Sequence, residues 1–225
     1  SRRAGIITNT TKDKNRGMGV IKDLLLNMGG VILDVSYQRV IETFKSYGIE
    51  NFDKVYTQAK QVEIIDLFEE GKCSAEEFRD GVRKLVGKEL SDEQIDKAWF
   101  SMILEIPRDV IQLLGVLKLK YRLFLFSNTN VLHIEYLKKE FERQLGFDLF
   151  NCVFDKAFFS NEIHHRKPHP ESFKYVLEQA GIEAEETLFI DDSKQHLEGA
   201  SKVGLNTYWL TNGETLIDLY DKKII

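Results

Sequence analysis

The pattern of apolar and polar positions divides the chain into a short apolar run, a long helical stretch and an alternating second half. Residues 20–26 are mostly aliphatic and are followed by Gly29-Gly30, which predicts a strand buried on both faces. From about Ser36 to Lys118 the apolar residues recur at helical spacing. The helical segments are QRVIETFKSYGI, FDKVYTQAKQVEIIDLFEEGK, SAEEFRDGVRKLVGK, SDEQIDKAWFSMI and PRDVIQLLGVLKLK.

The second half alternates between apolar strands and amphipathic helices. Strands are predicted over 122–126, 187–190 and 207–210, with a weaker candidate over 150–154. The helices between them are VLHIEYLKKEFERQL, HPESFKYVLEQAG and HLEGASKVG. Strands separated by helices imply right-handed crossovers and a parallel sheet. We therefore expect an α/β fold, with a doubly wound, parallel, Rossmann-like sheet as its core and an all-helical cap domain.

The domain limits follow from the same pattern. Residues 18–34 and 111–225 are assigned to the α/β core, and residues 35–110 to the helical cap. Residues 1–17 are polar, mixed in charge and without the apolar centre of a signal peptide, so we expect a flexible extension. Whether this extension belongs to the natural protein stays open.

Composition restricts the classes of partner. The formal net charge of -5 offers no basic surplus for nucleic acid, and the apolar runs are shorter than the roughly 20 residues that cross a bilayer. Only two cysteines occur, Cys73 and Cys152, without metal-ligand spacing. We expect a cytoplasmic protein with reduced thiols and with neither nucleic acid nor membrane as a partner. The oligomeric state is open.

Polar side chains follow three of the predicted strands. Asn27 follows the first strand, Ser127-Asn128 the second and Asp191-Asp192 the strand TLFI. Open α/β sheets bind ligands at the carboxyl ends of their strands. An amide, a hydroxyl and two carboxylates are therefore expected to meet at one place.

Two interpretations of Asp191-Asp192 are open. Adjacent carboxylates after a buried strand repel each other unless a cation lies between them and a ligand. Oxygen ligands of this kind suit Mg²⁺, which favours one or two carboxylates together with a phosphate oxygen. Alternatively, Asp192 or Ser193 caps the following helix. The two roles are compatible.

Lys167 is a candidate for binding an anion. It lies in HHRKPHPESF, where Pro168 and Pro170 stiffen the loop and a helix begins directly afterwards. A lysine near a helix start adds a positive charge to the favourable end of the helix dipole. The alternative is a solvated surface lysine, but the neighbouring strand-end cluster favours the binding role.

The motifs LLLNMGGV, LFLFSNTN, RKPHP and FIDDS occur in this order over about residues 20–212. In this order they resemble the haloacid dehalogenase superfamily, in particular its phosphatase-like branch with a helical cap inserted after the first strand. The resemblance implies a Mg²⁺-dependent phosphatase that hydrolyses a small phosphorylated metabolite, for example a sugar phosphate, through an aspartyl-phosphate. The partner would be a phosphorylated small molecule.

The resemblance also implies roles for individual residues. Ser127 and Asn128 would bind the phosphoryl group, and Lys167 would bind it and stabilise its charge. Asp191 and Asp192 would hold Mg²⁺. These roles suit phosphoryl transfer, in which the transition state spreads negative charge over three equatorial oxygens.

Two positions depart from the family pattern. Asn27 occupies the position of the nucleophilic aspartate, and Gly29 occupies the position where many members have a second aspartate. The Asn27 amide and the Gly29 backbone carbonyl would still face the metal. An amide does not readily form an aspartyl-phosphate, so this chain is expected to be inactive or to trap its substrate.

Three explanations of Asn27 are open: an engineered change, a natural loss that leaves a phospho-ligand-binding or regulatory pseudoenzyme, and a structural polar residue with no site behind it. The last leaves the other motif residues unexplained.

Overall fold

One sheet forms the centre of the molecule in the computed structural model, which describes residues 6–7, 19–55, 63–211 and 213–225. The strand order is β1-β6-β5-β2-β3-β4. All neighbouring strands are parallel except β1, which is antiparallel to β6. The strands are β1 (Ile6–Ile7), β2 (Asp23–Leu26), β3 (Arg122–Ser127), β4 (Lys156–Phe159), β5 (Thr187–Asp191) and β6 (Asn206–Trp209).

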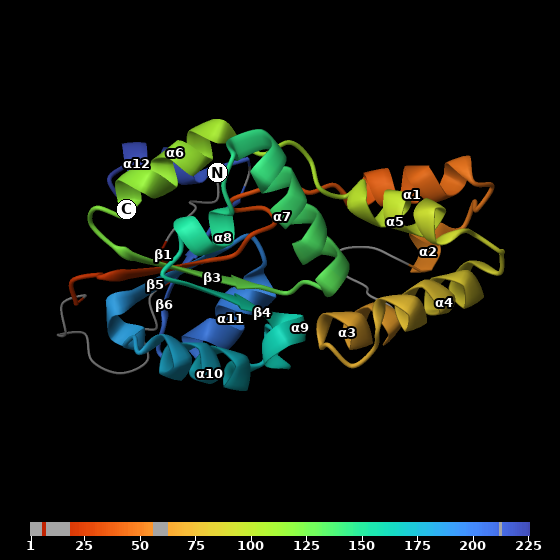
Figure 1. The fold of residues 1–225 in the computed structure, drawn as a ribbon. Helices are drawn as coiled ribbons and strands as arrows, with labels where there is room; N and C mark the ends of the chain where they lie inside the picture. Colours follow the sequence, from red (N-terminus) through yellow and green to blue (C-terminus); the bar gives the residue numbers. More distant parts are fainter. Residues whose placement is uncertain (1–5, 8–18, 56–62, 212) are drawn as a thin grey trace.

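Helices cover both faces of the sheet and form a separate block beside it. The described helices are α1 (Tyr37–Ser46), α2 (Phe52–Val55), α3 (Glu63–Glu69), α4 (Ala75–Val86), α5 (Asp92–Phe100), α6 (Arg108–Leu117), α7 (Val131–Leu145), α8 (Leu149–Cys152), α9 (Ser160–Ile163), α10 (Pro170–Ala180), α11 (Lys194–Ser201) and α12 (Leu216–Asp221). In Figure 1, α6, α7, α8 and α12 lie on one side of the sheet and α10 and α11 on the other. None of the described helices is long and apolar enough to cross a membrane.

The central residues of β2, β3 and β5 are apolar because both faces of the sheet are covered. Leu24 and Leu26 of β2 join the hydrophobic cluster that contains Leu114 of α6. Leu25 points to the opposite face and joins the cluster that contains Phe173 of α10. Burial on alternate faces explains the continuous apolar run, and the predicted doubly wound parallel sheet is confirmed.

Helices α1 to α5 share a hydrophobic cluster, which Leu132 of α7 also joins. Phe44, Phe68, Phe78 and Trp99 are buried in it, and the rings of Phe68 and Phe78 stack with 4.2 Å between their centroids. This block lies beside the carboxyl ends of the strands (Figure 1). Part of the predicted helical segment, residues 56–62, lies outside the described residues. The cap limits of 35 and 110 stay a prediction.

The strand predicted over residues 150–154 is wrong. Leu149–Cys152 forms α8, because the carboxylate of Asp148 accepts a hydrogen bond from the backbone N–H of Phe150 at 2.9 Å and starts a helical turn. Phe150 and Phe154 are both buried in the core cluster, so this short helix shows the same apolar spacing as a strand. The neighbour of β3 is instead β4.

Two residues of the predicted flexible extension form a strand, and flexibility of the extension as a whole stays a prediction. Ile6 and Ile7 form β1, with Ile6 opposite Tyr208 and Ile7 opposite Thr207. Without β1, β6 would be an edge strand with unpaired backbone groups. The rest of residues 1–17 lies outside the described part of the chain.

Candidate active site

Three adjacent strands bring their carboxyl ends to one edge of the sheet. Asn27 directly follows β2, Ser127 ends β3 and Asp191 ends β5. The backbone N–H of Asn27 donates to the carbonyl of Ile190 at 3.1 Å, which continues the pairing of β2 with β5. A cavity of about 340 Å³ opens at this edge. Predicted site residues that line it are Asn27, Gly29, Ser127, Asn128, Lys167 and Asp192, while Asp191 is fully buried.

Lys167 is a buried ammonium group at the centre of the site. Lys167 is only 1% exposed, and its Nζ donates to Oδ1 of Asn27 at 2.8 Å and to Oδ2 of Asp191 at 2.9 Å. A third bond reaches the backbone carbonyl of Phe126 at 3.0 Å. Three acceptors compensate for removing the charge from water. The alternative of a solvated surface lysine is therefore wrong.

The amide of Asn27 has its two ends in different surroundings. Oδ1 accepts from Lys167, whereas Nδ2 donates to the carbonyl of Gly29 at 2.7 Å. Nδ2 also lies 3.4 Å from Oδ1 of Asp191 and 3.4 Å from Oδ1 of Asp192. The opposite orientation would place an NH₂ group against an ammonium, so this hydrogen-bond network determines which end is nitrogen.

The oxygens around Nδ2 of Asn27 form a set that suits Mg²⁺. One backbone carbonyl and two carboxylates converge on a point that a hydrogen-bond donor fills here. Magnesium favours such a set, with one or two carboxylates and remaining positions left for water and phosphate. Among the described residues no three His, Cys, Asp or Glu side chains gather around a common point. A metal would thus depend on the Gly29 carbonyl as well as on Asp191 and Asp192.

The two aspartates differ in electrostatic surroundings. Burial opposes ionisation of Asp191, but the Lys167 ammonium and a hydrogen bond from His196 hold its pKa below the usual range. Burial and the neighbouring charge of Asp191 raise the pKa of Asp192 to about 7. The site therefore favours one negative charge on Asp191, and a cation would favour a second on Asp192.

The second glycine of the first motif, Gly30, lies directly against Asp192. Gly30 has φ +78°, a left-handed conformation that favours glycine. A Cβ at this position would lie 2.2 Å from Oδ2 of Asp192. The turn after β2 and the loop after β5 therefore approach each other closely only because residue 30 has no side chain.

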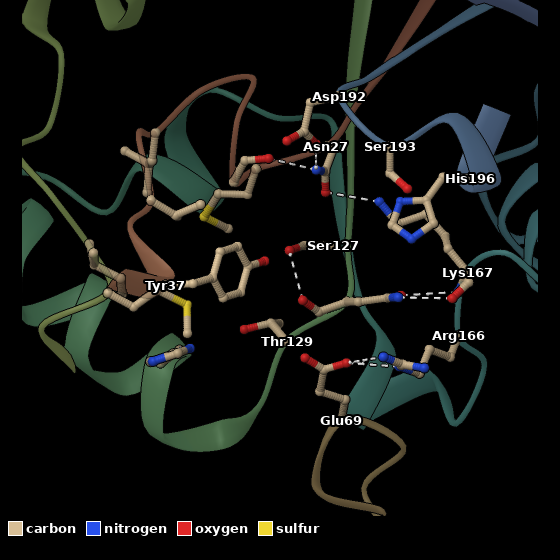
Figure 2. Close-up of a pocket in the computed structure, with 18 of the residues that line it drawn as sticks. Asn27, Tyr37, Glu69, Ser127, Thr129, Arg166, Lys167, Asp192, Ser193 and His196 are labelled. Carbon is tan, nitrogen blue, oxygen red and sulfur yellow. Dashed lines mark hydrogen bonds and ion pairs between the residues drawn. The ribbon is translucent and has the colours of Figure 1, made fainter. Parts of the chain in front are cut away.

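The loop after β3 holds the lysine loop in place. The side chain of Asn128 donates to the backbone carbonyl of Lys167 at 2.9 Å and accepts from its backbone N–H at 3.0 Å. The side chain of Ser127 instead points into the cavity (Figure 2). Of the two residues predicted to bind phosphate, Ser127 presents a hydroxyl group, whereas the amide of Asn128 is engaged with the protein backbone.

The alternative that Asp192 or Ser193 caps the next helix is correct for the position of Ser193 but not for a capping bond from its side chain. Ser193 occupies the N-cap position of α11, but no side-chain capping bond forms there. Instead, Oδ1 of Asp191 accepts from the backbone N–H of Ser193 at 2.9 Å. Nδ1 of His196, on the first turn of α11, lies 2.9 Å from the other carboxylate oxygen of Asp191. His196 is thus a site residue that was not among the predicted ones.

The far end of the cavity is built by residues that the sequence did not single out. Tyr37 and Glu69 come from the helical block, and Arg166 comes from the loop that carries Lys167. Nε of Arg166 lies 2.8 Å from Oε2 of Glu69, and Nη2 lies 2.7 Å from the same oxygen. Burial raises the pKa of Glu69, which Arg166 opposes. The only local signal is that Arg166 precedes a candidate site residue.

Comparisons with known proteins point to one family. Residues 25–204 match the family model described as haloacid dehalogenase-like hydrolase. The chain is 32% identical over 196 residues to the D-ribitol-5-phosphate phosphatase of Bacteroides thetaiotaomicron, an alignment that covers 86% of this chain and 94% of that protein. It is 28% identical over 210 residues to the phosphorylated carbohydrates phosphatase of Thermotoga maritima, covering 87% and 89%.

A solved structure agrees with these sequence relatives. A haloacid dehalogenase family enzyme of Bacteroides thetaiotaomicron is 39% identical to this chain, with a TM-score of 0.84, and the match covers 89% of this chain and 98% of that one. That enzyme was crystallised as an aspartate-to-alanine mutant in complex with magnesium and inorganic phosphate.

Proposed function

Because the chain belongs to the haloacid dehalogenase-like hydrolase family, we propose that its cavity binds the phosphate monoester of a small carbohydrate or polyol. The observation that carries this proposal is the convergence of Lys167, Ser127 and the two aspartates at the ends of three adjacent strands. The names of the relatives, which refer to ribitol phosphate and phosphorylated carbohydrates, support the substrate class. Hydrolysis of the ester is the reaction expected of this hydrolase family.

Each residue would have a separate role in binding the phosphoryl group. Lys167 supplies a fixed positive charge, because its three acceptors hold Nζ in place. Ser127 supplies a hydroxyl donor within the cavity. Asp191, Asp192 and the Gly29 carbonyl would hold Mg²⁺, which when bound neutralises charge on the phosphoryl oxygens.

Asn27 would limit turnover without removing the binding site. An amide nitrogen has no lone pair suited to attack on phosphorus, and the amide oxygen is directed to Lys167. For Asn27 to ligate the metal through oxygen, its amide would have to turn and give up that bond. We therefore expect substrate to bind and the aspartyl-phosphate step to be slow or absent.

The test is p-nitrophenyl phosphate hydrolysis with Mg²⁺ by this chain, by Asn27→Asp and by Asn27→Ala. The Asp variant restores a carboxylate nucleophile, so we expect its rate to exceed that of the other two by at least about a thousandfold. A panel of sugar and polyol phosphates extends the assay to natural leaving groups. A folded Asp variant that is as inert as this chain on every ester would contradict the proposal of a latent phosphatase.

A second candidate function is a binding protein that does not catalyse. This candidate is supported by the uncharged amide of Asn27. It accepts a hydrogen bond from Lys167 and donates to the Gly29 carbonyl and to both aspartates. Both candidates predict that phosphate esters bind in calorimetry, so hydrolysis by Asn27→Asp separates them: a binding protein would take up the esters while this variant remained inert.

A further inference from the structure

The carboxylate of Glu69 is unusual because it is buried beside a cavity. Glu69 ends α3, its residue is only 8% exposed, and it lines the same cavity as Lys167. A buried carboxylate requires compensation for the water it has lost. Arg166 provides it from the core, through Nε and Nη2.

Both contacts from Arg166 fall on one oxygen of Glu69. Nε and Nη2 meet Oε2, so the pair does not use the two-oxygen fork that a guanidinium and a carboxylate often form. Within the part of the chain that the structure describes, no hydrogen bond reaches Oε1. A carboxylate has about four lone-pair sites, so Oε1 keeps its capacity to accept. Figure 2 shows the carboxylate pointing from its helix toward the side of the cavity that carries Thr129.

Backbone contacts fix Glu69 relative to Lys167 and Ser127, where we propose that the phosphoryl group binds (the phosphoryl end of the cavity). Gly71 has φ +69°, and a Cβ there would lie 2.1 Å from the carbonyl oxygen of Asn161 in α9. Nδ1 of His164 lies 2.9 Å from the carbonyl of Glu70. The end of α3 therefore packs directly on the core. Because Arg166 adjoins Lys167 in sequence, one loop holds both the phosphoryl end and the acceptor at the other end.

The surroundings define which chemical group would meet Oε1. An anionic acceptor repels carboxylate and phosphate groups and attracts O–H donors. Phosphate bound near Lys167 would leave the rest of the ester extending toward Glu69. The other walls supply hydrocarbon surface for the carbon chain between the hydroxyl groups, from Met28, Leu33, Val35, Met102, Ile103 and Leu137.

We propose that Glu69 is a specificity-determining residue that accepts a hydrogen bond from a hydroxyl group of the substrate's leaving group, with Arg166 as its positioning residue. This proposal rests on the proposed function of the cavity. It narrows the substrate class to esters whose alcohol carries hydroxyl groups away from the phosphate. Simple alkyl phosphates lack the group that Glu69 would recognise.

The experiment is calorimetry of this chain with Mg²⁺ against ribitol 5-phosphate, pentyl phosphate and inorganic phosphate. Slow turnover at Asn27 allows equilibrium binding to be measured with an intact ester. In Glu69→Gln, which keeps the size of the side chain but lacks its charge, we expect ribitol 5-phosphate to bind about tenfold more weakly. Binding of the other two ligands should change by less than about twofold.

Two further variants keep the test decisive. Glu70→Gln removes a neighbouring carboxylate, which pairs with Lys72 and does not line the cavity, and should leave all three affinities within about twofold. The double change Glu69→Met with Arg166→Met replaces the buried pair by apolar groups of similar length. It should weaken the binding of ribitol 5-phosphate as Glu69→Gln does. Circular dichroism checks that each variant is folded.

The outcomes separate the two proposals. If phosphate and both esters fail to bind to the intact chain, the proposed function of the cavity is wrong, and the role of Glu69 falls with it. If they bind but ribitol 5-phosphate is held equally well by the Glu69→Gln and double variants, the role of Glu69 alone is wrong.

Discussion

The two ends of the cavity are built in different ways. At the phosphoryl end, Lys167 and Asp191 are buried and bonded to neighbours that follow adjacent strands of one sheet. At the far end, here called the cap end, Tyr37 and Glu69 come from the helical block, and an ion pair between Glu69 and Arg166 joins that block to the core. The buried phosphoryl end suits a reaction step that is the same for all substrates. The cap end combines residues of the helical block and of the core, and it suits discrimination among substrates.

The largest expected effect would come from removing the buried charge at the phosphoryl end. Lys167→Met leaves the Asp191 carboxylate fully buried without its ammonium partner. We expect the free energy of unfolding to fall by about 3–5 kcal/mol, measured by urea denaturation at pH 7, and phosphate binding to be lost.

Lys174→Met is the matched control for this change. Its ammonium pairs with Glu171 in solvent, with the Lys174 side chain 61% exposed, so the free energy of unfolding should change by less than about 0.5 kcal/mol. Equal effects of the two substitutions would show that the buried ion pair at the phosphoryl end stabilises the protein no more than a solvated one.

A second effect is expected at the joint between the two units. His133 of α7 stacks on Trp99 of α5, with 4.9 Å between the ring centroids, and its Nε2 lies 3.0 Å from the Trp99 carbonyl. Burial lowers the pKa of His133 to about 4. Below its ordinary pKa of about 6.5, His133 takes up a proton in the unfolded chain but stays neutral in the folded protein. Stability from this residue is complete above that pH and is lost as the pH falls toward 4.

The measurement compares urea unfolding of this chain and of His133→Gln at pH 7.5 and at pH 4.5. We expect the chain to lose about 2–3 kcal/mol more than the variant between the two values, because glutamine does not titrate. Groups shared by both proteins cancel in this difference. Parallel pH profiles would mean that His133 is not held neutral at the joint.

The smallest effect should arise from the support of the lysine loop. Asn128→Ala removes two hydrogen bonds to the backbone of Lys167 and should lower the free energy of unfolding by about 1–2 kcal/mol. Because the lysine would be less well held, inorganic phosphate should bind several-fold more weakly in calorimetry.

Asn206→Ala tests whether that weakening is local. Its side chain also makes two bonds to backbone, to the carbonyls of Glu185 and Thr187, but it lies on β6 outside the cavity lining. A similar loss of stability with unchanged phosphate affinity is expected. If both variants bind phosphate equally weakly, the effect of Asn128 is one of general stability.

The phosphoryl end could be predicted well because its residues carry local signals. Apolar runs buried on two faces identify strands, and polar residues directly after them must reach the same edge of a parallel sheet. This reasoning led to Asn27, Ser127 and Asp191, and the resemblance to the haloacid dehalogenase superfamily is confirmed. It did not show that the Asn128 side chain bonds to backbone, because that contact depends on how two loops meet.

The cap end carried no comparable signal. Glu69 and Arg166 are 97 positions apart, and each lies in a charged segment whose pattern is that of an ordinary solvated surface. The strand predicted over residues 150–154 failed for a related reason, since a short apolar pattern does not distinguish a strand from a buried helical turn.

The sequence by itself determined the sheet, the helical block and the order in which chemical groups follow the strands, because periodicity and burial act over a few neighbouring residues. Only the tertiary structure decided which of these groups form hydrogen bonds and ion pairs with one another. It placed the Asn27 amide between an ammonium and three oxygens, left Asp191 as the more acidic carboxylate and turned one oxygen of Glu69 away from Arg166. Those outcomes depend on distances of a few ångströms between distant segments and on the water that burial removes.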